Sequence, residues 1–288
     1  MAIIVNTNMS ALKTQNNLNN ATSSLNKALE RMSTGYKINS AKDDAAGMYV
    51  ATNLNKLIGG SKIAQSNIET GNNVLSTVEG NLDVILDNLN RIRDLTVQAS
   101  NGVYDENSQK AMSDEVKARL AEIDRIAVSA EFNGLKLLDG TADIATDGLR
   151  LQVGANAAEN ANCIRVDASV FQTMSAEAGL GLDASQIEDK FKDADQAAAY
   201  ISTVDQAIED VNTRKATIGA IQNRLDAASA SLTTTIENAT AAQSTIMDAD
   251  IAEESAEYTK QQILQQTSAS LLVQANNLPS LALTLIGG

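Results

Sequence analysis

The stretch that decides the fold is residues 54–92, LNKLIGGSKIAQSNIETGNNVLSTVEGNLDVILDNLNRI. Its seam positions follow one another at alternating spacings of three and four residues, the pattern of a coiled coil. Two of these positions hold Ser61 and Gly71. The apolar ones are Leu54, Leu57, Ala64, Ile68, Leu75, Val78, Leu82, Ile85, Leu89 and Ile92. We therefore predict one long helix over 44–100, with Gly59-Gly60 as the place for a kink.

The same periodicity extends toward the N-terminus and into a third helix. A first helix over 10–36 carries the seam Ala11, Gln15, Leu18, Thr22, Leu25, Leu29, Met32 and Tyr36. Ser40 and Asp43 then form an S-x-x-D start signal for the long helix. After the Asn101-Gly102 turn, a further helix carries Met112, Val116, Leu120, Ile123 and Ala127 on one face.

Beyond residue 197 the helical period returns and runs to Pro279, where we expect the helix to end. Its apolar seam is Val204, Ile208, Val211, Ile218, Leu225, Leu232, Ile236, Ala239 and Ile246, followed by Leu264, Leu271, Ala275 and Leu278. The polar seam positions are Lys215, Gln222, Ser229 and Gln243. These polar residues are either simply tolerated, or they fix the register and keep the contact weak enough to switch between two packings.

The middle of the chain has a different period. Leu149, Leu151 and Val153 alternate with polar residues, as do Ile164 and Val166, so we predict a β-hairpin at about 148–168. The two helical halves can then pair as an αα-hairpin. The predicted fold is mainly α, a long antiparallel coiled-coil helical bundle with a small central β-hairpin.

Composition argues against several classes of function. The chain has 288 residues, a net charge of −14 and no His, which removes His-dependent nucleophiles, bases and zinc ligands. Cys163 is the single cysteine, so a catalytic thiol would lack its usual His partner. The charge disfavours nucleic acid, and the pairs Asp248/Asp250 and Asp193/Asp195 are too few ligands for a metal cage. We expect no enzymatic activity, no cofactor and no metal.

The sequence contains neither of the usual patterns for membrane insertion or secretion. No stretch reaches the length of a membrane span, which predicts no membrane insertion, and the N-terminus lacks the pattern of a secretory signal. By these rules alone the protein would be cytosolic.

Both ends of the chain carry apolar stripes with little remaining sequence to cover them. Either the ends complete an intramolecular bundle, or the stripes are an interface between copies, which we favour. A contact of the head-to-tail kind that does not close gives a helical filament.

Several blocks of sequence together resemble the bacterial flagellin family. They are NTN at 6–8, LKTQNNL at 12–18, RMSTGYKINSAKDDAAG at 31–47, RIRDLTVQA at 91–99, EFNG at 131–134, DADIAEE at 248–254 and QANNLP at 274–279. The resemblance covers about residues 1–139 and 197–279. The sequence differs from the family's usual pattern at Cys163 and in the tail that ends at Gly287-Gly288.

The resemblance implies a structural subunit that polymerises into the flagellar filament for swimming motility. Residues 1–43 and 248–288 would form the inner coiled-coil domain that lines the channel, and 44–247 the outer-tube helical bundle, in a minimal form with little central insertion. It implies identical subunits in a helical filament, and as further partners a flagellar export chaperone, filament cap proteins and hook-associated proteins. Type III export needs no cleaved signal, so the expected location becomes extracellular.

Two sets of residues are candidates for contacts. The resemblance places Arg91, Leu95 and Glu115 where flagellins contact the vertebrate flagellin-sensing Toll-like receptor; alternatively the two charges are solvated and Leu95 packs between helices. The predicted polymerisation seam is Leu18, Leu25, Leu29, Met32, Leu264, Leu271, Ala275 and Leu278.

The closest alternative is a hook–filament junction protein, a relative that seats the filament without building it. The match at both ends favours flagellin. A flagellin-based protease needs a His-dependent zinc motif, which is impossible here. A coiled-coil secretion effector would explain the heptads but not the paired end signatures.

Overall fold

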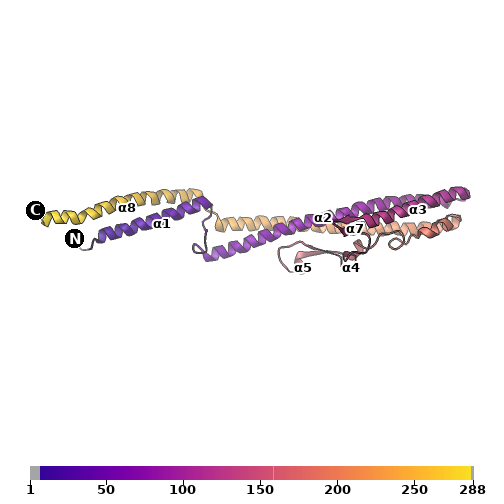
Figure 1. Ribbon diagram of the computed structural model, residues 1–288, viewed down its shortest axis with the longest axis horizontal. Helices are drawn as coiled ribbons and strands as arrows, with labels where there is room; N and C mark the ends of the chain where they lie inside the picture. The colour runs from indigo at the N-terminus through magenta and orange to yellow at the C-terminus, as the bar shows by residue number, and fades with distance from the viewer. Residues whose placement is uncertain (1–6, 158, 287–288) are drawn as a thin grey trace. The chain divides into compact units, whose positions relative to one another are not determined.

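The computed structural model describes residues 7–157 and 159–286, apart from the side chains of 159–160 and 278–286. The chain divides into two compact units. Unit 1 is Met1–Lys56 with Asn238–Gly288, and unit 2 is Leu57–Glu237. Helices α2 (Ala45–Ala99) and α7 (Ala194–Met247) contribute residues to both units. The mainly α class with long packed helices is confirmed (Figure 1).

Unit 1 is built on helices α1 (Met9–Thr34) and α8 (Ile251–Ile286), which lie side by side and antiparallel (Figure 1). The Asn8 side chain begins α1 by accepting a 3.0 Å hydrogen bond from the backbone N–H of Ala11. Gly35 ends it in the left-handed conformation, at φ 75°. Helix α8 continues past Pro279 to Ile286, so the predicted end at Pro279 is wrong: proline removes one donor without breaking the helix here.

Helix α2 begins one residue after Asp44. The Oδ1 of the Asp44 carboxylate accepts hydrogen bonds of 3.0 Å from the backbone N–H groups of Ala46 and Gly47, as an N-cap residue does. The helix thus starts within one residue of the predicted range 44–100, but the residue that caps it is Asp44 and not Ser40 of the S-x-x-D signal. The Ser40 backbone N–H and hydroxyl instead donate to the Asp43 carboxylate, each over 3.1 Å, and close the turn that precedes the helix.

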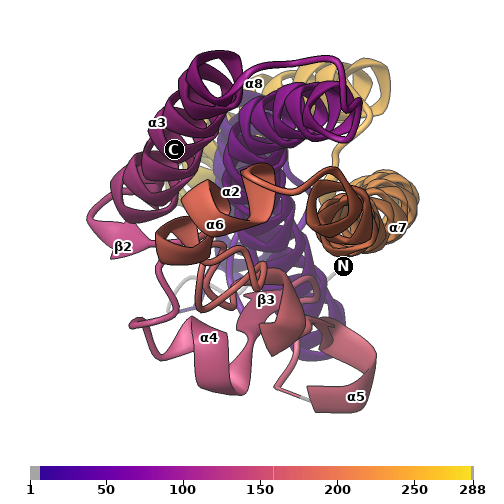
Figure 2. The same ribbon diagram turned by 90° about the vertical axis from the view of Figure 1, so that its right-hand side faces the viewer.

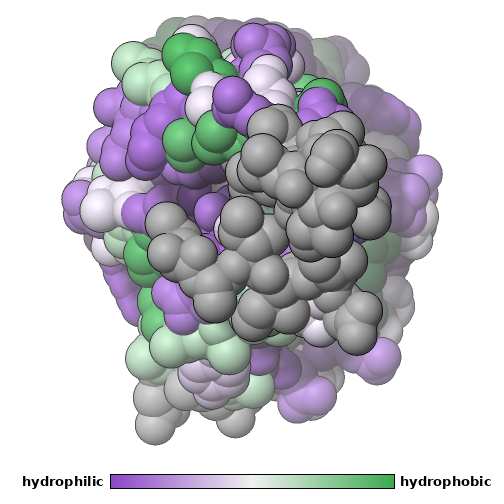
Figure 3. Space-filling view, turned by 90° about the vertical axis from the view of Figure 1, so that its left-hand side faces the viewer, coloured by the Kyte–Doolittle hydropathy of each residue, from purple (hydrophilic) through white to green (hydrophobic). Residues whose placement is uncertain are grey.

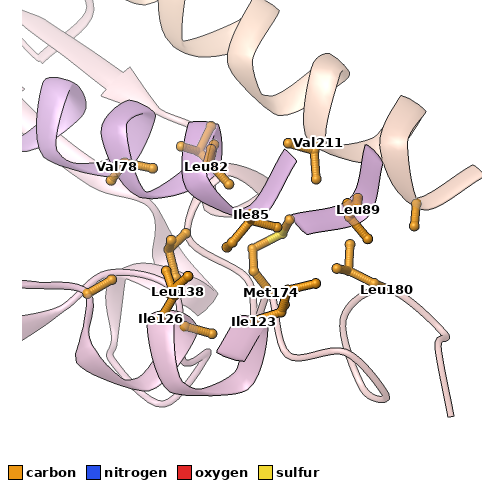
Figure 4. Packing of buried hydrophobic residues seen from close by; sticks show 14 of the residues in the cluster. Val78, Leu82, Ile85, Leu89, Ile123, Ile126, Leu138, Met174, Leu180 and Val211 are labelled. Carbon is orange, nitrogen blue, oxygen red and sulfur yellow. The ribbon is translucent and has the colours of Figure 1, made fainter. Parts of the chain in front are cut away.

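Unit 2 contains α2, α3 (Glu106–Ser129) and α7, whose apolar faces share one core. Figure 2 looks along these helices, with α3 and α7 on opposite flanks and α6 (Ile187–Phe191) between them. The close-up in Figure 4 shows Leu82, Ile85 and Leu89 of α2 packed toward Ile123 of α3 and Val211 of α7. All five side chains are 0% exposed, and most of the predicted seam positions of these three helices are buried. The exceptions among the apolar positions are Leu54, Leu57, Ile208, Ile236 and Ile246, which are only partly buried.

Two small antiparallel strand pairs complete unit 2. The predicted hairpin is confirmed as β3 (Leu149–Gln152) and β4 (Cys163–Val166), with α5 (Glu159–Asn162) between them. The second pair is β1 (Glu131–Phe132) and β2 (Leu135–Lys136), joined at Asn133-Gly134. Positive φ values of 50° and 80° at these two residues fit a two-residue hairpin turn. The remaining short elements are α4 (Ile144–Asp147), η1 (Ala168–Val170) and η2 (Ala184–Gln186).

Two glycines explain how the β3–β4 hairpin lies against α2. A Cβ at Gly60 would stand 2.8 Å from the Cβ of Ala155, and one at Gly71 would stand 2.6 Å from the Cδ1 of Leu151. Asn67, between them on α2, donates a 3.3 Å hydrogen bond to the carbonyl of Gln152. Gly71 therefore occupies a seam position because the hairpin fills the space that a side chain would take, and α2 continues as one helix through Gly59-Gly60.

Candidate polymerisation surface

The interface between α1 and α8 is filled by small side chains. Ala21 and Ala28 of α1, and Ser268 and Ala275 of α8, are each 9% exposed or less. No large apolar side chain of the described parts of α1 and α8 is buried to this degree. Small residues let the two helix backbones approach closely, but they bury little apolar area.

Polar contacts hold this helix pair in register along its length. The Asn8 amide donates to the carbonyl of Ala275 over 2.7 Å. The Gln265 amide donates to the Thr22 hydroxyl over 3.1 Å. Further along, the Arg31 guanidinium donates to the carboxylate of Glu254 over 2.9 Å.

Many of the large apolar side chains of unit 1 are exposed instead. They are Met9, Leu12, Leu29, Tyr36, Tyr49, Val50, Ile251, Ile263, Leu264, Leu271 and Val273, between 43% and 71% exposed. On the face shown in Figure 3, apolar residues in green stand beside hydrophilic ones in purple. An apolar surface of this extent is typical of an interaction site.

The predicted polymerisation seam is thus divided between the two sides of the helix pair. Leu29, Leu264 and Leu271 are exposed by 53%, 43% and 50%. Leu18, Leu25 and Met32 are half-buried, and Ala275 is buried. The side chain of Leu278 lies outside the described residues. Helix α1 packs against α8 through Ala21 and Ala28, each of which precedes a predicted seam position by one residue. Leu29 is therefore exposed to solvent.

The segment that connects α1 to α2 and the segment that connects α7 to α8 form backbone hydrogen bonds with each other. Tyr36 and Asp248 form an antiparallel bridge, in which the Ala249 N–H donates to the Gly35 carbonyl over 2.9 Å. Asp250 caps α8 through a 2.8 Å hydrogen bond from the Ala252 N–H. Asp250 therefore acts as a helix cap. Within the described residues, no cluster of three or more His, Cys, Asp or Glu could hold a metal ion.

Close to this junction, Asp43 is strongly stabilised as a carboxylate. The Lys27 ammonium lies 2.8 Å from one of its oxygens, and Ser40 donates to the other. The hydrogen bond from Lys27, and then that from Ser40, lowers the pKa of Asp43 to about 2. The pair ties the turn before α2 back to α1.

In unit 2, two of the three candidate receptor contacts pair with each other. The Arg91 guanidinium donates two hydrogen bonds to the Glu115 carboxylate, over 2.8 and 3.2 Å. These bonds lower the pKa of Glu115 and raise that of Arg91. Both side chains are at least one-third exposed, whereas Leu95 is 2% exposed and packs in the core. The three residues therefore differ in what they offer to a partner.

The chain matches two family models. One, described as the bacterial flagellin N-terminal helical region, covers residues 5–143, and the other, the flagellin C-terminal helical region, covers 201–286. The flagellin of Bacillus subtilis is 38% identical over 301 residues, with 98% of this chain and 99% of that protein covered. The chain belongs to the bacterial flagellin family. It is a structural subunit of the flagellar filament.

Other flagellins are similarly close. Flagellin FlaB1 of Treponema pallidum is 35% identical over 280 residues, covering 95% of this chain and 96% of that protein. Polar flagellin A of Vibrio parahaemolyticus is 31% identical in an alignment of 380 residues, longer than this 288-residue flagellin. None of the described helices is long and apolar enough to cross a membrane.

Solved structures match as well. A putative flagellar hook-associated protein from Vibrio parahaemolyticus has a TM-score of 0.58 at 18% identity, covering 72% of this chain and all of that one. At that identity the likeness concerns the fold alone. The flagellin relatives cover nearly the whole chain at higher identity, so the junction-protein alternative is the weaker one.

Proposed function

We propose that this flagellin polymerises through the outward apolar side chains of unit 1. The observation that supports this is the distribution of side chains in the α1–α8 pair, in which the buried residues are alanine and serine while large apolar residues such as Met9, Ile263 and Leu264 are exposed. Burying these side chains against another copy contributes roughly 25 cal/mol for each Å² of apolar area removed from water. The contact between copies is therefore the step at which unit 1 gains most of its stabilisation.

Residues 1–43 and 248–288 form the inner coiled-coil domain of the filament, and 44–247 form the outer-tube domain. The exposed apolar residues of α1 and α8 support this assignment, because they need a continuous neighbouring surface. The enclosed core of unit 2 supports a part that folds without such a neighbour.

The test of this proposal replaces two outward leucines by glutamine, Leu264→Gln with Leu271→Gln. Because both are about half exposed in the monomer, its helix content and melting temperature should stay unchanged. Seeded polymerisation, followed by sedimentation and electron microscopy, should be strongly impaired. The matched control is Gln266→Ala, an exposed polar position on the same helix, which should polymerise normally. Normal filaments from the double variant would refute the proposal.

The same proposal sets the expected partners and location. The subunit leaves the cell by the type III route, is escorted by an export chaperone, and is placed between hook-associated and cap proteins in an extracellular filament. It has no enzymatic activity. Deleting the exporter should retain the protein inside the cell, whereas detection of the wild-type chain only in the cytosol of flagellated cells would contradict the assignment.

A vertebrate Toll-like receptor is a further proposed partner, which recognises the free monomer through Arg91 and Glu115. Their exposed, bidentate pair supports this, and buried Leu95 contributes by shaping α2 beneath them. Soluble monomer should activate a receptor-reporter cell, and Arg91→Ala should weaken the response. The control is Arg125→Ala, since Arg125 also pairs with a glutamate on α3. No response to wild-type monomer at high dose would remove the claim.

A further inference from the structure

Arg214 of α7 contacts the segment that contains Gln172. It is half-buried, and its Nη1 donates a 2.7 Å hydrogen bond to the backbone carbonyl of Gln172. Among the described residues no carboxylate forms an ion pair with it, whereas other arginines do form such pairs, namely Arg31, Arg91, Arg93, Arg119 and Arg125. Burial lowers the pKa of the Arg214 guanidinium, partly offset by Asp210. A half-buried guanidinium that forms no direct ion pair retains N–H donors with which it can bind an anion.

Arg214 lines two small hollows. One, of about 240 Å³, is lined by Gln172, Thr173 and Gly179 among others, and none of the described residues that line it is Asp or Glu. The other, of about 210 Å³, includes Asp210 in its wall. An anion would be repelled by Asp210 in the second hollow, so the first is the one that suits it.

The walls of the first hollow are made largely of backbone. Gly140 adopts φ 75°, and a Cβ there would stand 3.0 Å from the Cβ of Thr173. A Cβ at Gly179 would stand 2.3 Å from the carbonyl oxygen of Thr173. The hollow is smaller than the roughly 300 Å³ at which pockets for drug-sized molecules begin. Its size and its cation together select a small, polar ligand.

We propose that Arg214 and this hollow form a binding site for a small oxyanion, a phosphate or a carboxylate. The planar guanidinium offers several N–H donors in a fixed geometry that matches two oxygens of such a group. The group comes either from solution or from a second copy, since the chain carries 36 aspartate and glutamate residues.

The experiment titrates inorganic phosphate into the full-length, ¹⁵N-labelled monomer at constant ionic strength. Saturable shifts are expected for the amides of Gly140, Thr173 and Gly179. Arg214→Gln should weaken binding by on the order of tenfold or more, because the charged donor is lost. Arg214→Lys should retain part of it, which guards against a Gln variant that folds poorly. The control Arg224→Gln changes an exposed arginine on the same helix and should bind as the wild type does.

Two outcomes overturn the site: no saturable shift in the wild type, or equal shifts in Arg214→Gln. The source of the oxyanion is read from assembled filaments by equilibrium dialysis with radiolabelled phosphate. Filaments that still bind phosphate through Arg214 identify a free ion as the ligand. Filaments that exclude it, together with slower assembly of Arg214→Gln, identify a carboxylate of another copy.

Discussion

The core of unit 2 and the α1–α8 pair of unit 1 use opposite rules of packing. In unit 2 the seam holds leucine, isoleucine and valine with no exposed surface, contributed by α2, α3 and α7. In the α1–α8 pair the buried positions hold alanine, serine and hydrogen-bonded polar groups, while the large apolar residues are half-buried or exposed. Two helices bury one stripe each, whereas three helices and a hairpin can enclose a core.

The difference shows which part of the subunit is complete by itself. Hydrophobic burial is the main favourable term in folding, and unit 2 obtains it within one chain. Unit 1 leaves the same kind of surface in water and obtains register from polar contacts, which contribute only about 1 kcal/mol each. A filament subunit gains from this arrangement, because the surface that is unsatisfied in the monomer drives assembly.

The largest expected effect is the loss of a side chain from the unit 2 core. Leu89→Ala removes a fully enclosed leucine that packs between α2, α3 and α7 (Figure 4), and should cost about 2–5 kcal/mol of unfolding free energy. Leu271→Ala in unit 1, where the leucine is 50% exposed, should change it by no more than about 0.5 kcal/mol. Chemical denaturation of both monomers measures the two values. Equal losses would break the comparison.

The next effect concerns the ion pair that fixes the register of unit 1. Glu254→Gln removes the charge facing Arg31, and the two side chains are 12% and 30% exposed. The α1–α8 pair should lose about 1 kcal/mol of stability, which is measured as faster amide hydrogen exchange in α1 of the monomer. A double-mutant cycle with Arg31→Gln isolates the coupling between the two. A coupling energy of zero would mean that unit 1 takes its register from other contacts.

The sequence predicted the part of the fold that depends on period. Leu75, Val78 and Leu82 keep one spacing, and all are fully enclosed as that spacing requires. It did not predict which face of α1 meets α8, because Ala28 and Leu29 are adjacent and both fit a helical stripe. Leucine is the more apolar, but close approach of two lone helices selects alanine. Periodicity also carries no signal for the space around Arg214, which depends on where the segment containing Thr173 folds back.

A pH titration sharpens the comparison at the junction of unit 1. Asp43 has a pKa of about 2, below its ordinary 3.8, so the folded state binds its proton more weakly than the unfolded state. Its stabilisation is present in full above pH 3.8 and is lost as the pH falls through about 2. In Lys27→Gln the pKa of the Asp43 carboxyl should rise toward its ordinary value, because the hydrogen bond from the Lys27 ammonium, which lowers it most, is removed. NMR of the side-chain carboxyl carbon measures both midpoints, and identical midpoints would exclude Lys27 as the cause.

The smallest expected change in monomer stability lies between α2 and α7. Here Gln222 donates a long, 3.4 Å hydrogen bond to Glu79, and Asn72 one of 3.3 Å to Asp226. Bonds of this length contribute little, so Gln222→Leu with Ser229→Leu should shift the monomer by less than about 1 kcal/mol.

The two leucines would nevertheless extend the apolar seam of α7 by two positions and favour a single packing against α2. If the polar seam residues allow two packings, filaments of this variant should be straight or fixed in one shape, with reduced swimming. Electron microscopy of the filaments and tracking of cells measure this. An unaltered waveform would mean that the polar residues are only tolerated, and that unit 2 is as rigid in the filament as its enclosed core is in the monomer.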